Sequence, residues 1–211
     1  MKYLLRIILF PPPKRVDVHV GEKGTAESLI FLEVLRHVTT PNIFINYVDT
    51  EGIPSVTVDD SYSPQVGLLS CSRYLCRLTG TYPHSPEKAL IVDSFLEDYP
   101  LLLRDLQESQ SSLEETRDAD GLAEEHKMPP NHKIFSLLDK METRLQTETN
   151  VWISSESFSF VDILCLGILK YTELLFPSMK EEVIASKYPL VMDWWNTCSE
   201  RRRSGGHSPV S

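Results

Sequence analysis

Ser157-Phe158-Ser159-Phe160-Val161-Asp162 leads into Ile163-Leu164-Cys165-Leu166-Gly167-Ile168-Leu169, the longest apolar run of the chain. Ser159 stands three residues before Asp162, which is the spacing of a capping box at a helix start. The residues that follow are apolar on nearly every face, which is typical of a helix in the middle of a bundle. The run is shorter than the roughly 18 uncharged residues that a membrane span needs. We therefore expect a capped helix in a helical core.

The composition of the 211-residue chain indicates a packed core and an acidic surface. Hydrophobic residues make up 41%, which is too many for a disordered chain. The formal net charge of −9 disfavours binding to nucleic acid or to an anionic membrane, because either would need a basic face. We expect no direct nucleic-acid partner and no membrane association.

The cysteines form neither a CxxC pair nor a Cys/His cluster with zinc spacing. Their surroundings are apolar and helix-like, where cysteine usually acts as a small hydrophobic residue. We therefore expect no metal site, no cofactor, and reduced thiols in a cytoplasmic protein. The four residues are Cys71, Cys76, Cys165 and Cys198.

Strands alternate with helices in the first part of the chain, which indicates an α/β layer. Residues 16–20 alternate β-branched and polar side chains and predict a strand that includes His19. Thr25 precedes a segment with helical periodicity and is a candidate N-cap. The expected elements are a strand at 16–20, a helix at 25–38, strands at 42–48 and 53–58, a strand or lead-in at 65–69, and a helix at 70–78.

The second part of the chain is predicted to be helical. Pro86 suits the first turn of a helix that runs to about Leu106. Residues 107–130 are polar and acidic, which predicts a frayed helix end and a mobile loop. Further helices are expected at 131–146, after Ser159, and at 188–202. The predicted domains are an N-terminal extension at 1–15, an α/β domain at 16–82, an all-helical domain at 83–203 with its acidic loop near 107–130, and a disordered tail at 204–211.

Four motifs, in this order along the chain, resemble those of the glutathione S-transferase superfamily. Gly24–Glu27 resembles the segment that opens the family's first helix, and Gly52–Val56 resembles its proline-led strand. Arg73–Leu75 resembles a helix ending of the family, and Ser159–Asp162 resembles the capping box of its core helix. The resemblance implies an α/β plus all-α fold, with a thioredoxin-like N-terminal domain followed by an all-helical C-terminal domain.

The resemblance also implies where an active enzyme would hold glutathione. In the family, a hydroxyl or thiol on the first strand or in the next turn lowers the thiol pKa of glutathione, and the register places His19 there. A neutral imidazole could donate a hydrogen bond to a thiolate, but a lone histidine on an alternating strand is also typical of an edge position. Ile53 and Pro54, where the family has a cis peptide bond, would pair with the cysteinyl backbone, and Ser70 or Ser72 would bind the γ-glutamyl end.

Two departures from the family pattern weaken this glutathione site. Leu69 or Cys71 precedes the serine where the family has Glu or Gln, so the amino group of the ligand would lack its acidic or amide partner. Only Asp49–Gly52 separates the second strand from the third, where the family has a second helix that holds the glycine carboxylate. A compact first domain of this kind resembles the non-catalytic members found in the translation machinery, including the appended domain of methionyl-tRNA synthetase and the auxiliary proteins of synthetase complexes.

The sequence therefore leaves two functions open. The first is a non-catalytic protein–protein interaction module of a translation-type complex that contains an aminoacyl-tRNA synthetase or an elongation factor. The second is a glutathione S-transferase that conjugates glutathione to electrophiles or reduces peroxides, with glutathione as the co-substrate. In both cases the resemblance implies a homodimer or a hetero-association with another domain of the same fold.

Overall fold

The computed structural model describes residues 16–22, 24–38, 43–44, 52–58, 64–120, 128–148, 151–154 and 157–203. The chain divides into two compact units, residues 1–82 and residues 83–211. The extension predicted at 1–15 and the tail predicted at 204–211 lie outside the described residues. Most of the short link at 49–52 lies outside them as well.

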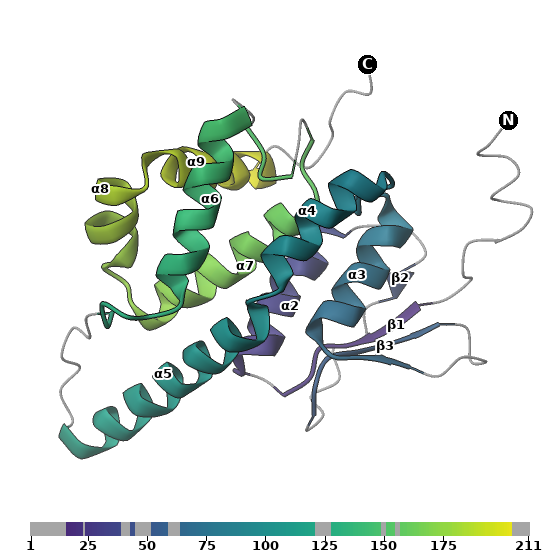
Figure 1. Cartoon of the computed structure of the whole chain (residues 1–211). Helices are drawn as coiled ribbons and strands as arrows, with labels where there is room; N and C mark the ends of the chain where they lie inside the picture. The colour runs from purple at the N-terminus through teal and green to yellow at the C-terminus, as the bar shows by residue number, and fades with distance from the viewer. Residues whose placement is uncertain are drawn as a thin grey trace, which may run out of the picture. The chain divides into compact units, whose positions relative to one another are not determined.

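The described residues of the first unit form a four-stranded mixed sheet with two helices beside it (Figure 1). The strand order is β2-β1-β3-β4. β1 pairs in parallel with β2 and antiparallel with β3, and β3 pairs antiparallel with β4. The strands are β1 (Val16–His19), β2 (Ile43–Phe44), β3 (Ser55–Val58) and β4 (Gln65–Val66). The alternating strand predicted at 16–20 is confirmed.

Helix α2 (Ala26–His37) begins at the predicted N-cap, where the Thr25 hydroxyl accepts a hydrogen bond from the Ser28 amide at 3.3 Å. Helix α3 (Leu68–Thr79) begins two residues before the predicted start. The reason is Gly67, which has a φ of +92° and turns the chain from β4 directly into the helix. At the other end, Gly80 closes α3 in a left-handed conformation, as glycine commonly does after a helix.

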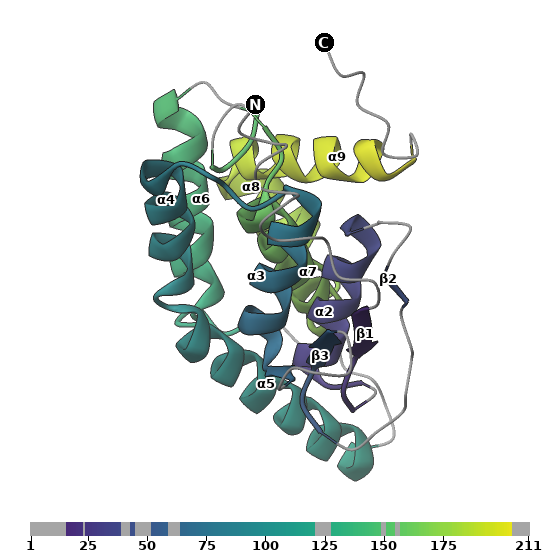
Figure 2. The same ribbon diagram turned by 90° about the vertical axis from the view of Figure 1, so that its right-hand side faces the viewer.

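The described part of the second unit is helical throughout (Figures 1 and 2). The prediction of one helix from Pro86 to about Leu106 is wrong, because the segment is two helices, α4 (Pro86–Leu96) and α5 (Tyr99–Asp120). Pro100 has no N–H to donate to a preceding turn and is tolerated only in the first turn of a helix. Helix α4 therefore ends at Leu96, and the new helix α5 starts at Tyr99, with Pro100 in its first turn.

The prediction of a frayed helix end and a mobile loop at 107–130 places the end of the helix too early, because residues 107–120 continue α5. The buried side chain of Leu106 and a hydrogen bond from the Tyr171 hydroxyl to Gln110 Oε1 anchor this part of the helix. The polar residues beyond them include Glu and Arg, which are good helix formers without being buried. Residues 121–127 of the predicted loop lie outside the described residues.

Helix α7 (Phe160–Leu175) is the central helix of the second unit, with every residue from Phe160 to Leu169 buried. α7 contacts α4 and α5, and α9 (Pro189–Arg203) contacts α6 (Ile134–Glu148). A short π-helix, η1 (Lys180–Ile184), and α8 (Ala185–Lys187) connect α7 to α9. Within the described ranges, no helix is both long enough and apolar enough to cross a membrane.

Candidate functional site

The residues predicted to bind glutathione meet where β3 begins. The Pro54 carbonyl accepts a hydrogen bond from the Gly67 amide at 2.8 Å, which ties the segment before β3 to the start of α3. His19 pairs with Ser55 in the β1–β3 register. We call residues 19–22, 52–55 and 67–72 the Pro54 corner. The structure thus brings the predicted site residues together, although they are up to 53 positions apart in sequence (from 19 to 72).

His19 is the last residue of β1 and is half-buried. Val16 and Val18 lie on the buried face of the strand, so His19 shares the opposite face with Asp17. No described residue forms a hydrogen bond or an ion pair with the His19 ring. Among the described residues, no side chain orients the ring toward a thiolate.

The turn after β1 is closed by backbone contacts that the sequence did not predict. The Glu22 amide donates a hydrogen bond to the Gly52 carbonyl at 2.9 Å. Gly21 has a φ of +89°, and a Cβ atom at this position would lie 2.8 Å from the Gly52 carbonyl oxygen and 3.0 Å from the Pro54 nitrogen. Only glycine fits here, since both the conformation and the space exclude a side chain. The turn therefore carries no hydroxyl or thiol at this point.

The hydroxyl groups nearest to this turn in sequence belong to the start of α2. The Thr25 hydroxyl lies 3.0 Å from the Glu22 carbonyl oxygen and accepts from the Ser28 amide. The Ser28 hydroxyl donates to the Thr25 carbonyl at 3.0 Å. Both hydroxyls are engaged in capping the helix, so their hydrogen bonds stabilise α2.

The start of α3 has an exposed hydroxyl, no side-chain cap and no acidic residue in its first turn. Gly67 is the N-cap and offers no side-chain hydrogen bond. Ser70 is exposed, whereas Ser72 is fully buried and its hydroxyl has no hydrogen-bond partner among the described residues. Of the two candidate serines, Ser70 alone is open to a ligand. Leu69 stands before it, so the residue preceding this serine offers neither a carboxylate nor an amide to a ligand's amino group.

Cys71 is the thiol of the Pro54 corner, and it is buried. Its Sγ donates to the carbonyl oxygens of Gln65 at 3.3 Å and Pro54 at 3.5 Å. Burial raises the pKa of the Cys71 thiol to about 12, and backbone hydrogen bonds offset only part of this effect. A thiol that stays protonated is a poor nucleophile, so Cys71 acts as a packing residue.

Apolar side chains are exposed beside the Pro54 corner. Ile53 is 55% exposed and Val66 is 47% exposed. Val66 pairs with Ser55 in the β3–β4 register, and Ile53 lies two residues before Ser55. Ile53 and Val66 therefore belong to the same end of the sheet. β4 is the last strand of the described sheet and pairs only with β3 there. Two exposed apolar side chains thus stand where a charged tripeptide would bind.

The capping box of Ser159 and Asp162 is present, as predicted, at the start of α7. Asp162 Oδ1 accepts hydrogen bonds from the Ile153 amide at 2.8 Å and from Trp194 Nε1 at 3.0 Å. Its Oδ2 accepts from the Ser159 amide and hydroxyl, both at 3.0 Å. Burial raises the pKa of Asp162, and these hydrogen bonds oppose the rise. The pair joins α7 to α9 and to the segment before it, which is a structural role.

Residues 122–202 match the family model for the glutathione S-transferase C-terminal domain. Solved structures resemble about nine-tenths of the chain. A possible glutathione S-transferase from Rhodopseudomonas palustris has 14% identity and a TM-score of 0.63, with 88% of this chain and 94% of that chain covered. The glutathione S-transferase from Ascaris lumbricoides has 14% identity and a TM-score of 0.62, with coverages of 90% and 94%. The chain has the glutathione S-transferase fold.

Prostaglandin synthase D of Nilaparvata lugens shares the fold as well, with 12% identity, a TM-score of 0.63, and coverages of 93% and 100%. Identities this low show the fold and nothing finer. A comparison with curated proteins gives no match. Whether a glutathione S-transferase fold binds glutathione therefore has to be judged from the residues of the Pro54 corner.

Two further observations bear on the glutathione site. The Ile53–Pro54 peptide bond is trans, and no described residue has a cis bond, whereas the resemblance implied a cis bond before Pro54. No group of three His, Cys, Asp or Glu side chains in the described ranges could hold a metal ion. The Glu22–Gly52 hydrogen bond and the exposure of Ile53 and Val66 were not predicted, because both depend on how distant segments meet. For the Glu22–Gly52 hydrogen bond, the only signals in the sequence were a glycine after the first strand, at position 21, and the proline that leads the third strand.

Proposed function

We propose that this protein uses the glutathione S-transferase fold as a non-catalytic protein–protein interaction module. The turn after β1 carries the proposal. Activation of a glutathione thiol needs a donor that points at the sulfur, and this turn is Gly21 held against Gly52 and Pro54. The nearest hydroxyls cap α2, and His19 has no group that orients it among the described residues.

The exposed apolar surface beside the Pro54 corner also supports an interaction role. Ile53 and Val66 together offer hydrophobic contact area, and the adjacent Ser70 can supply a hydrogen bond at the rim. Protein interfaces commonly combine an apolar centre with a polar rim. A charged tripeptide would instead need ionic partners, and Leu69 and Gly67 do not supply them.

The partner that we propose is another domain of the same fold, in a homodimer or in a translation-type complex with an aminoacyl-tRNA synthetase or an elongation factor. The reason is the resemblance of a compact first domain to the non-catalytic members of that machinery. We place the protein in the cytoplasm, where its four free, buried cysteines would stay reduced.

The second candidate function is a glutathione S-transferase. The structural relatives named above favour it, and so does the start of α3, where the first-turn amides and the exposed Ser70 could accept an anion. In that case His19 would donate to the thiolate, Ile53 would pair with the cysteinyl backbone, and Ser70 would bind the γ-glutamyl carboxylate.

A glutathione titration separates the two functions. A protein that binds glutathione would gain about 2.7 kcal/mol at a hundred times its Kd, which is a clear thermal shift. We expect no shift at millimolar glutathione and no turnover of a model aryl halide. A saturable shift together with turnover would show that the protein is an enzyme and would overturn the proposal.

Capture of partners from a lysate tests the interaction surface. We expect Ile53→Asp or Val66→Lys to abolish capture of the partner. Val151→Lys is the matched control, because Val151 is also an exposed apolar residue, at 56%, but lies in the other unit. Equal loss in all three variants would contradict the role of the Pro54 corner. Capture of no synthetase, elongation-factor subunit or protein of this fold would contradict the translation assignment.

A further inference from the structure

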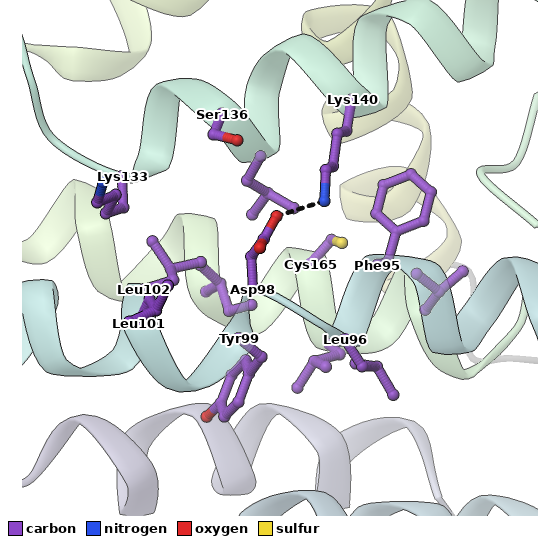
Figure 3. Close-up of a pocket in the computed structure, with 14 residues that line it drawn as sticks. Phe95, Leu96, Asp98, Tyr99, Leu101, Leu102, Lys133, Ser136, Lys140 and Cys165 are labelled. Atoms are coloured by element: carbon purple, nitrogen blue, oxygen red, sulfur yellow. Dashed lines mark hydrogen bonds and ion pairs between the residues drawn. The ribbon is translucent and has the colours of Figure 1, made fainter.

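The helical unit contains a cavity that is separate from the Pro54 corner. Its volume is about 150 Å³, and it lies between the α4–α5 turn, the N-terminal half of α6, and the first turns of α7 (Figure 3). The floor is apolar and is made mainly by α7. Its lining includes Leu96, Leu102, Val161, Leu164, Cys165 and Ile168.

The N-terminal half of α6 and the residue before it place two lysines and a serine at the rim of this cavity. Lys133 directly precedes the helix, and Ser136 and Lys140, four residues apart, lie on one side of it. All three residues line the cavity, so an anion at its rim would meet a hydroxyl and the two ammonium groups. The arrangement resembles a cradle for one negative charge.

The rim carries a net positive charge. Asp98 is the one acidic side chain in the lining, and it forms an ion pair with Lys140 at 2.5 Å. Figure 3 shows these two side chains facing each other across the middle of the pocket, with Lys133 set apart from them. No ion pair joins Lys133 Nζ to a described residue. Asp105 accepts the Lys133 backbone amide at 2.7 Å but does not line the cavity.

The size of the cavity limits what can enter it. An apolar cavity of about 150 Å³ holds roughly one benzene ring. The Asp98–Lys140 pair crosses the opening, which favours a slender molecule over a folded protein segment. A ligand with one ring or a short chain and a single anionic end would place its apolar body against α7 and its charge at the rim.

We propose that this cavity binds a small amphipathic monocarboxylate, with its apolar group on Leu164, Cys165 and Ile168 and its carboxylate held by Lys133, Ser136 and Lys140. The apolar group of the ligand matches the uncharged floor of the cavity. The carboxylate matches the rim, where one lysine, Lys133, has no ionic partner in the described part of the chain. Cys165 contributes as a neutral wall, since burial raises the pKa of its thiol well above the usual value. This proposal does not depend on the interaction module.

The probe is 3-phenylpropionate, titrated into the full chain and followed by amide chemical shifts. An 11-heavy-atom ligand of this kind should bind with a Kd of roughly 1 mM or tighter. We expect saturable shifts confined to residues 96–102, 133–140 and 161–168. The matched neutral probe is 3-phenylpropan-1-ol, which should bind about tenfold more weakly, because it lacks the charge. An alcohol that binds as tightly as the acid would overturn the anionic head group.

Surface variants test the rim without disturbing the core. Lys133→Gln should weaken 3-phenylpropionate binding by about three- to tenfold, whereas Lys187→Gln, an exposed lysine on α8, should leave it unchanged. Ser136→Tyr should abolish binding by filling the opening. The absence of saturable shifts would overturn the proposal. So would shifts at these residues that depend on protein concentration and not on the probe, because a second copy of the chain would then cover the cavity.

Discussion

The starts of α7 and α3 both place polar groups among apolar residues, but the polar groups at α7 are bonded within the protein, whereas Ser70 at α3 faces solvent. At α7 a carboxylate and a hydroxyl are buried, and Asp162 accepts four hydrogen bonds from three different segments. At α3 the N-cap is Gly67, no side chain caps the helix, and Ser70 is exposed. The first site is saturated by the fold, and the second is open to solvent.

The difference distinguishes a motif that stabilises the fold, at the start of α7, from a position that could bind a ligand, at the start of α3. Ser159 and Asp162 cannot bind a ligand without releasing the contacts that join α7 to α9. The start of α3 could bind a ligand without such a loss, but Leu69 and the buried Ser72 leave it poorly equipped for a charged peptide. The strongest sequence motif therefore identifies the architecture, whereas the case for or against glutathione binding depends on the individual residues at the start of α3, Leu69, Ser70 and Ser72.

The largest expected effect follows from removing the carboxylate at α7. Asp162→Ala would leave two buried amides, an indole N–H and a hydroxyl without their acceptor, at a cost of about 4 kcal/mol in the free energy of unfolding. Denaturant unfolding followed by tryptophan fluorescence measures this, because Trp152, Trp194 and Trp195 all lie in the helical unit. Ser85→Ala, at the solvent-accessible cap of α4, is the control and should cost about 1 kcal/mol. Equal losses in the two variants would contradict the special role of Asp162.

The next effect tests whether the turn after β1 is closed as described. Gly21→Ala adds a Cβ atom 2.8 Å from the Gly52 carbonyl oxygen and should destabilise the first unit by about 3 kcal/mol. Gly24→Ala is a matched control, since Gly24 has the same φ of +89° but open space around it, and should cost about 1 kcal/mol. Hydrogen exchange of the β1 and β3 amides reports on this unit. Similar exchange rates in both variants would mean that the turn does not contact Gly52 and Pro54.

The sequence predicted those parts of the fold that repeat a local pattern. The alternation of Val16 and Val18 identified β1, and the spacing of Ser159 and Asp162 identified the start of α7. The break before Tyr99 was missed because apolar residues continue on both sides of it, and only Pro100 marks it. The helical character of residues 107–120 was missed because these residues bury little surface, so hydrophobic periodicity carries no signal there.

The candidate site could be predicted only in part. The motif containing Ile53 and Pro54 predicted the strand that follows it, β3, because a proline-led strand is visible in sequence. The exposure of Ile53 and the burial of Ser72 could not be predicted, since both depend on which face of a strand or helix meets a neighbour from elsewhere in the chain. The cavity beside Lys133 and Lys140 was missed for the same reason, as its lining comes from four helices.

A pair of serine variants sharpens the comparison at a smaller scale. Ser159→Ala removes half of the capping box and should destabilise the helical unit by about 1–2 kcal/mol in tryptophan-monitored unfolding. Ser72→Ala removes a buried hydroxyl that has no partner in the described residues, so it should be neutral or stabilise the first unit by up to about 1 kcal/mol. Loss of protection from hydrogen exchange in Ser72→Ala would show that this hydroxyl has a partner after all.

The smallest effect concerns a third helix start, that of α6. His132 Nδ1 lies 3.1 Å from the Ile134 amide, from which it accepts a hydrogen bond, and also 3.1 Å from Asp105 Oδ2. Ser109 Oγ lies 3.3 Å from Nε2, so the neutral ring caps the helix when its proton is on Nε2. Burial lowers the pKa of His132, and the nearby carboxylate of Asp105 only partly opposes this. The fold therefore favours the neutral ring. Its contribution to stability is complete above the unfolded pKa of about 6.5 and is lost as the pH falls below that value.

At pH 6.5 protonation of the unfolded chain should cost about 0.4 kcal/mol of stability, and the slope below that pH cannot exceed about 1.4 kcal/mol per pH unit for one group. Tryptophan-monitored unfolding between pH 7.5 and 5.5 should therefore give a steeper decline for the parent than for His132→Gln. His84→Gln, which replaces an exposed histidine, should follow the parent curve. If His132→Gln retains the full pH dependence, the neutral imidazole does not cap α6. The start of that helix would then resemble the uncapped start of α3 more than the saturated start of α7.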